Sequence, residues 1–163
     1  MQNRLPKRIV IKEDTGGYAP VTYFTSLIIK KNSISYQEET EGDSMFFAER
    51  DYSYKYKIES SLFEIRFNEL ARAIEKVVEE INSGKRLVLH CTDVGINEIT
   101  VYYEDGKKLK LEFYRSLYEN EYIEVANIIR SMIPNCEQIS EYLMTPDELK
   151  EMYDPDLDDN SDE

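Results

Sequence analysis

The segment ITVYYEDGKKLKLEF (residues 99–113) decides the fold of this chain. Apolar or aromatic side chains alternate with other residues on both sides of Asp105-Gly106, at Ile99, Val101 and Tyr103 before it and at Leu109, Leu111 and Phe113 after it. A period of two is typical of a strand with one buried face. Because Asp-Gly supplies the positive φ angles of a tight turn, the segment predicts a β-hairpin.

An amphipathic helix is predicted on each side of this hairpin. Their apolar residues recur at helical spacing, namely Leu70, Ala73, Ile74, Val77, Val78 and Ile81 in the first helix, and Tyr122, Val125, Ala126, Ile129, Met132 and Ile133 in the second. We expect Asn68 to cap the first helix and Gly84 to end it, while Pro134 ends the second. Two helices with one apolar stripe each and a sheet with one apolar face predict an α+β fold, in which a mostly antiparallel sheet has both helices packed on one face.

Further strands are predicted before and between these elements. RLVLHC (residues 86–91) suits a strand within the helix–strands–helix core, and residues 9–11, 21–29 and 34–37 suit three more. The acidic stretch 38–51 is expected to be an exposed loop. Tyr52, Tyr54 and Tyr56 alternate with polar residues, so they should share one face of another strand.

The chain of 163 residues is expected to form one domain over residues 1–153. It divides into a β-rich part (1–67), the helix–strands–helix core (68–133) and a short helical appendage (134–153), in which Thr145-Pro-Asp-Glu148 predicts a capping box. Residues 154–163 hold six carboxylates and no cation, which predicts a disordered acidic tail. No apolar run approaches a membrane span or a secretory signal, so we expect a cytoplasmic protein that does not enter membranes.

The net charge of −13 is concentrated in the last third of the chain. Residues 1–60 hold nine cations and nine acids, residues 61–115 hold nine and ten, and residues 116–163 hold two and fourteen. The final segment therefore contributes −12 of the total. Such asymmetry favours a partner of opposite charge, although acidic surfaces also serve solubility alone.

A basic, nucleic-acid-binding protein is the partner that this charge predicts. Carboxylates three or four residues apart on a helix lie about 5–6 Å from each other, and such spacing could occupy a groove built for phosphates. The expected contact set is Glu119, Glu121, Glu124, Glu137, Glu141, Asp147 and Glu148 with the tail, and Tyr52, Tyr54 and Tyr56 are expected to supply apolar anchors. We expect no direct contact with nucleic acid. The oligomeric state stays open.

Two other classes of function have some support in the sequence. A cytoplasmic regulatory module could bind a partner through the tyrosine face, although a half-buried sheet face explains the same pattern. An enzyme is suggested by LVLHCTDVGIN (residues 87–97), which resembles the start of a cysteine-phosphatase loop. Asn97 occupies the position of the arginine and a strand follows in place of a helix, so both anion-binding elements are missing. We therefore expect no enzymatic activity, no metal and no cofactor.

In size, acidity and lack of a catalytic motif, the chain resembles the inhibitors that phages and mobile elements direct against host defence, such as anti-CRISPR and anti-restriction proteins. The resemblance lies in overall character and in no signature residue. It implies a non-enzymatic inhibitor that blocks the access of nucleic acid to a CRISPR effector or restriction enzyme.

Overall fold

The computed structural model describes residues 4–14, 21–42, 52–88 and 95–153 of the chain. These residues form one six-stranded sheet in the order β4-β3-β2-β1-β5-β6, and every neighbouring pair is antiparallel. The strands are β1 (Pro6–Asp14), β2 (Val21–Lys30), β3 (Ser33–Gly42), β4 (Tyr52–Lys57), β5 (Ile96–Tyr103) and β6 (Lys108–Tyr114). Three helices accompany the sheet, so the predicted α+β class is confirmed.

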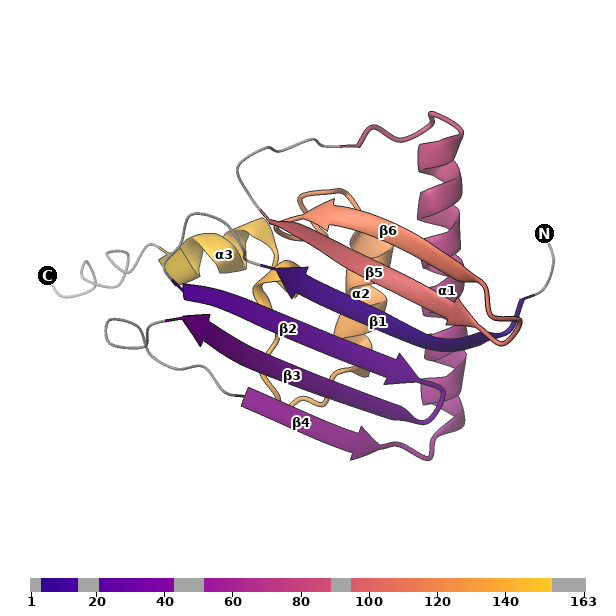
Figure 1. Ribbon diagram of the computed structural model, residues 1–163, viewed down its shortest axis with the longest axis horizontal. Helices are drawn as coiled ribbons and strands as arrows, with labels where there is room; N and C mark the ends of the chain where they lie inside the picture. Colours follow the sequence, from indigo (N-terminus) through magenta and orange to yellow (C-terminus); the bar gives the residue numbers. More distant parts are fainter. Residues whose placement is uncertain (1–3, 15–20, 43–51, 89–94, 154–163) are drawn as a thin grey trace, which may run out of the picture.

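The helices are α1 (Ser61–Asn82), α2 (Ile123–Met132) and α3 (Pro146–Tyr153), and a single 3-10 turn, η1 (Glu141–Leu143), precedes α3. Figure 1 shows α1 and α2 behind the sheet, and α1 contacts α2, β1 and β6. Among the described residues, no helix combines the length and the apolar character needed to cross a membrane.

The core lies between the sheet and these two helices. Two rows of side chains across the sheet are apolar or aromatic on the helix side, as the strand register shows. One row consists of Tyr56, Ile34, Ile29, Ile9, Val101 and Leu109, and the next of Tyr54, Tyr36, Leu27, Ile11, Ile99 and Leu111. Phe67, Leu70, Ile74, Val125 and Ile129 of the helices are fully buried in the same core.

The predicted hairpin at Asp105-Gly106 is present. Gly106 has φ +82°, and the Asp105 carboxylate accepts a hydrogen bond of 3.0 Å from the backbone N–H of Lys107. The tight turn at residues 31–32 joins β2 to β3. β3 continues to Gly42, so the loop predicted from residue 38 was wrong for residues 38–42. Pairing with β2 along the whole of β3 explains the difference, and residues 43–51 lie outside the described residues.

The first helix begins at Ser61, seven residues before the predicted start. Ser60 is the N-cap, and its side chain accepts a hydrogen bond from the Phe63 backbone. Asn68 lies inside the helix, where its amide donates to the carbonyl oxygen of Glu64 at 2.9 Å. The apolar stripe extends back through Phe67 and Phe63, which are both buried, and this burial favours the longer helix. Gly84 follows the helix with φ +73°, as its predicted role requires.

Residues 86–88 of the predicted strand 86–91 are not a strand. The backbone N–H of Arg86 donates to Glu80 O at 3.2 Å, and the Arg86 guanidinium pairs with the Glu80 carboxylate at 2.7 Å. These contacts hold the segment against the end of α1, and Leu87 is 90% exposed. Residues 89–91, including His90 and Cys91, lie outside the described residues.

Local signals placed the last two helices correctly. α2 ends at Met132, two residues before Pro134. At the start of α3, the Thr145 backbone donates to the Glu148 carboxylate at 2.7 Å and the Glu148 backbone donates to Thr145 Oγ1 at 3.2 Å. This reciprocal pair is the capping box that the sequence predicted.

Candidate binding site

A polar row borders the apolar rows on the helix side of the sheet. Register pairs place Glu13 beside Thr25, Thr25 beside Glu38, and Glu38 beside Tyr52. Side chains on alternate positions of a strand share a face, so Glu13 faces the same side as the buried Ile11, and Glu38 the same side as Tyr36. Two carboxylates are thereby brought to the edge of the core.

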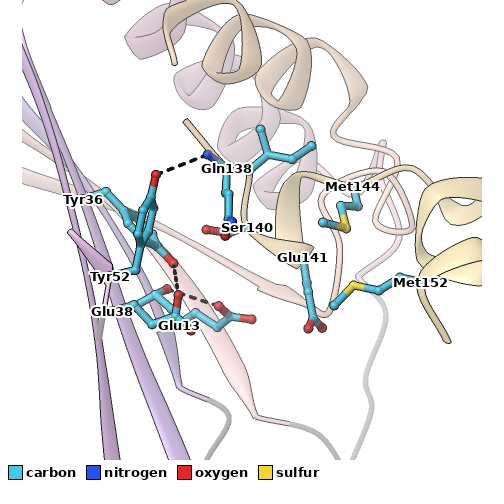
Figure 2. Close-up of a pocket in the computed structure, with 11 residues that line it drawn as sticks. Glu13, Tyr36, Glu38, Tyr52, Gln138, Ser140, Glu141, Met144 and Met152 are labelled. Carbon is cyan, nitrogen blue, oxygen red and sulfur yellow. Dashed lines mark hydrogen bonds between the residues drawn. The ribbon is translucent and has the colours of Figure 1, made fainter. Parts of the chain in front are cut away.

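The chain after α2 covers this row and closes a pocket of about 460 Å³. Figure 2 shows Glu13, Glu38 and the two tyrosines on the sheet side, facing Ser140, Glu141, Met144 and Met152. Among the described residues, the pocket lining contains three carboxylates, Glu13, Glu38 and Glu141, and no lysine or arginine. We call these three acids and the space between them the anionic pocket.

The carboxyl group of Glu13 is electrostatically the most perturbed part of the anionic pocket. Its pKa is raised from 4.5 to about 7, first by burial and then by the negative charge of Glu141, with Glu38 adding to the effect. A hydrogen bond of 3.2 Å from Thr25 Oγ1 opposes this shift. Near neutral pH the Glu13 carboxylate is held in an environment that disfavours its charge, which is characteristic of functional sites.

Two tyrosines, Tyr36 and Tyr52, line the pocket beside the carboxylates. The Tyr36 hydroxyl donates to Glu38 at 3.2 Å, and burial raises the pKa of Tyr36 above its ordinary value. The backbone N–H of Gln138 donates to the Tyr52 hydroxyl oxygen at 3.5 Å, a bond drawn in Figure 2. The walls of the pocket thus combine aromatic faces with acceptor oxygens.

The tyrosine face and the acidic third of the chain meet at Glu137. The hydroxyls of Tyr52 and Tyr56 both donate to the Glu137 carboxylate, and these two bonds lower its pKa. Cys136 is an exposed free thiol, and its Sγ lies 3.7 Å from the Tyr56 hydroxyl oxygen. Tyr54 is buried between its neighbours, and residues 136–138 contact the hydroxyls of Tyr52 and Tyr56. A partner could therefore reach only part of the tyrosine face.

Three of the predicted contact acids have cationic partners within the chain. Glu148 forms a two-pronged pair with the Arg130 guanidinium at 2.7 and 2.9 Å, which together with the Thr145 backbone lowers its pKa to about 2. Glu119 lies 3.7 Å from Arg115, and Glu124 lies 3.8 Å from Lys76. These charges are partly neutralised before any partner arrives.

The other predicted acids are less neutralised. The side chain of Glu121 is exposed, and Asp147 is exposed in the first turn of α3. Glu141 accepts a hydrogen bond of 2.6 Å from the Tyr153 hydroxyl and lines the anionic pocket. The structure therefore brings Glu141 and Tyr52 together in one site, while Glu121 and Asp147 lie outside the pocket lining. The tail, residues 154–163, lies outside the described residues.

Glu13 and Glu38 were not among the residues predicted from the sequence. The signal was present, because the alternation that identifies Ile9 and Ile11 continues to Glu13, and the one that passes through Tyr36 continues to Glu38. The strands predicted at residues 9–11 and 34–37 stop before both acids, so their place on the buried face was not predicted.

Within the described residues, no three histidine, cysteine or acidic side chains are close enough together to hold a metal ion. The candidate phosphatase loop at His90 and Cys91 lies outside that part of the chain. No protein-family model, no curated protein and no solved structure matches the chain.

Proposed function

We propose that this chain is a non-enzymatic cytoplasmic protein that binds a basic partner protein through the anionic pocket and the acidic C-terminal third. One observation carries the proposal: Glu13, Glu38 and Glu141 line one pocket, and the part of the chain that the structure describes adds no cation to that lining. An uncompensated set of carboxylates is costly in the free protein, and a cation from outside would reduce that cost.

A lysine or arginine side chain suits the chemistry of the pocket. The carboxylates would accept hydrogen bonds from its charged end, and Tyr36 and Tyr52 offer aromatic faces to a cation. Met144 and Met152 line the same pocket and would contact the apolar stem of such a side chain. The exposed Glu121 and Asp147 would act at longer range and speed association.

We propose further that the partner is a nucleic-acid-binding protein, such as a CRISPR effector or a restriction enzyme, and that binding blocks its nucleic-acid site. This class of protein carries the lysine and arginine grooves that an acidic surface complements. The net charge of −12 carried by residues 116–163 supports this choice.

The test measures binding of a labelled octa-arginine peptide at low and high salt. The variant Glu13→Gln/Glu38→Gln/Glu141→Gln should weaken binding about tenfold or more, because it empties the pocket of charge. The matched control, Glu79→Gln/Glu104→Gln/Glu112→Gln, removes the same charge from exposed positions outside the pocket. Equal loss in both variants would reject the pocket and leave only net charge as the cause.

A second measurement addresses inhibition. Cleavage of DNA by a restriction enzyme or CRISPR effector from the native host should fall when the wild-type chain is added, and less so with the pocket variant. Full activity of every such host enzyme at saturating wild-type protein would reject the inhibitor assignment.

A further inference from the structure

The sheet face opposite the anionic pocket is basic, although the whole chain is acidic. Side chains of one row across this face belong to Lys57, Ser33, Lys30, Arg8, Tyr102 and Lys108. Arg8 falls beside Lys30 because the next residues along each strand, Ile9 and Ile29, are paired. The adjacent row has Lys55 at one end and Lys110 at the other.

These two rows therefore hold six cations and no acid, and all six side chains are exposed. We call them the basic rows. Within the strands, the nearest carboxylates on this face are those of Glu98 and Glu112, in the third row. Six strands at about 4.8 Å spacing give the rows a length of about 24 Å.

Most of these cations are not neutralised within the described part of the chain. The Arg8 guanidinium lies 4.2 Å from the centre of the Tyr102 ring, and the Lys108 ammonium lies 5.1 Å from it. The ring holds both cations in place without cancelling their charge. Lys30 and Lys55 make no ion pair with any described carboxylate. The two exceptions stand at the ends of the rows, where Lys110 pairs with Glu98 at 2.7 Å and Lys57 with Glu59 at 2.8 Å.

We infer that the basic rows bind single-stranded nucleic acid, with phosphates along the cations. Proteins that bind single strands commonly use an open sheet that combines cations for the backbone with aromatic rings for the bases. Ser33 and Ser35, half-exposed between the cations, can donate to phosphate oxygens. Phe24, on the same face but two rows beyond the basic rows and paired with Glu39, is 39% exposed and offers a ring for a base at the margin of the site.

This surface goes beyond the proposed function and replaces the expectation of no direct contact with nucleic acid. The anionic pocket lies on the helix side of the sheet and the basic rows on the other, so the two sites can be occupied together. A chain with both could bind a basic protein and the nucleic acid beside it. Neither site depends on the other, and each has its own test.

The experiment measures fluorescence anisotropy of a labelled oligo-dT of about 20 nucleotides with the full chain. Wild-type protein should bind at low salt, and binding should weaken as salt rises. The variant Arg8→Gln/Lys30→Gln/Lys108→Gln should bind about tenfold more weakly or worse. Its slope of log affinity against log salt should be shallower by about two, because each phosphate that is neutralised on a single strand adds about 0.7 to the slope.

The matched control is Arg72→Gln/Lys76→Gln/Lys85→Gln, which removes three exposed cations from α1 and the residues after it. It changes net charge equally, so its affinity should stay within about twofold of wild type if the site is the sheet face. An equal loss in both variants overturns the proposal. So does absence of wild-type binding at low salt, or tighter binding to vesicles of anionic lipid or to poly-glutamate than to oligo-dT.

Photo-crosslinking of wild-type protein gives a readout that needs no variant. Bromodeoxyuridine in the oligonucleotide should crosslink to peptides from β1, β2 or β5, which carry Arg8, Phe24 and Tyr102. Crosslinks confined to α1, α2 or α3 would overturn the assignment even if the variants failed to fold.

Discussion

Glu13 on β1 and Glu38 on β3 flank Thr25 in one row of the sheet, on the side that faces the core. The negative charge of Glu38 is among the causes that raise the pKa of Glu13, after burial and the charge of Glu141. Two acids two strands apart and turned inward are an unfavourable arrangement for stability. Their cost can be measured directly.

Glu13→Gln should stabilise the protein at alkaline pH. The folded-state pKa of about 7 exceeds the ordinary 4.5, so the folded state binds more protons in this window and stability falls as pH rises through it. The difference corresponds to about 3 kcal/mol at most. The free energy of unfolding of the variant should therefore match that of wild type near pH 4.5 and exceed it by about 1–3 kcal/mol above pH 7.

Urea unfolding across this pH range checks the prediction, with Glu104→Gln in the exposed β5–β6 turn as control. The control should follow the wild-type pH profile. A Glu13→Gln profile parallel to wild type at every pH would show that Glu13 ionises normally.

Glu148 should have the opposite dependence on pH. Its pKa is lowered from 4.5 to about 2, so its contribution is fully present above 4.5 and is lost as pH falls toward 2. Glu148→Gln should reduce the free energy of unfolding by about 1 kcal/mol at neutral pH, because the side chain is 38% exposed and solvent weakens its pair with Arg130.

Thermal unfolding at neutral and acid pH tests this, and Asp147→Asn is the matched control one residue earlier in α3. The loss of stability of Glu148→Gln relative to wild type should become smaller as the pH is lowered. A larger effect from Asp147→Asn would contradict the assignment of the cap and ion pair to Glu148.

Tyr56 and Glu137 should be energetically coupled. The Tyr56 hydroxyl donates to Glu137, a hydrogen bond to a charged acceptor between positions far apart in the sequence. A double-mutant cycle with Tyr56→Phe and Glu137→Gln should give a favourable coupling energy, which solvent exposure makes smaller than that of a buried bond to a charged acceptor. A cycle of Tyr56→Phe with Glu59→Gln should give none. Additivity in the first cycle would mean that the bond does not hold the 136–138 segment to the sheet.

The sequence identified features set by neighbouring residues and missed those set by strand register. The hairpin at Asp105-Gly106 and the capping box from Thr145 to Glu148 need only local chemistry, and both are present. The anionic pocket combines Glu13, Glu38 and Glu141 from three distant segments, and no local pattern fixes which residues become neighbours across strands. The basic rows were hidden for the same reason, since their cations come from the four strands β1, β2, β4 and β6.

Tyr142 allows a last test, of the core beneath the anionic pocket. Its side chain is fully buried and packs edge-on against Phe113, yet its hydroxyl makes no hydrogen bond of ordinary geometry among the described residues, although the Ser140 side chain lies near it. A buried hydroxyl without a partner costs about 1–3 kcal/mol, and phenylalanine keeps the ring while removing the cost. Tyr142→Phe should therefore leave stability unchanged or raise it.

Tyr103→Phe is the comparison, because the Tyr103 hydroxyl donates to Glu75 at 2.6 Å. Loss of this bond should lower the free energy of unfolding by about 1 kcal/mol. Urea unfolding of both variants at neutral pH shows whether each substitution raises or lowers the free energy of unfolding. If Tyr142→Phe were the more destabilised of the two, the hydroxyl would have to be satisfied, by a buried water or by a group outside the described residues. The pocket floor would then be more polar than its lining residues indicate, and the cationic side chain proposed for it would share the site with that group.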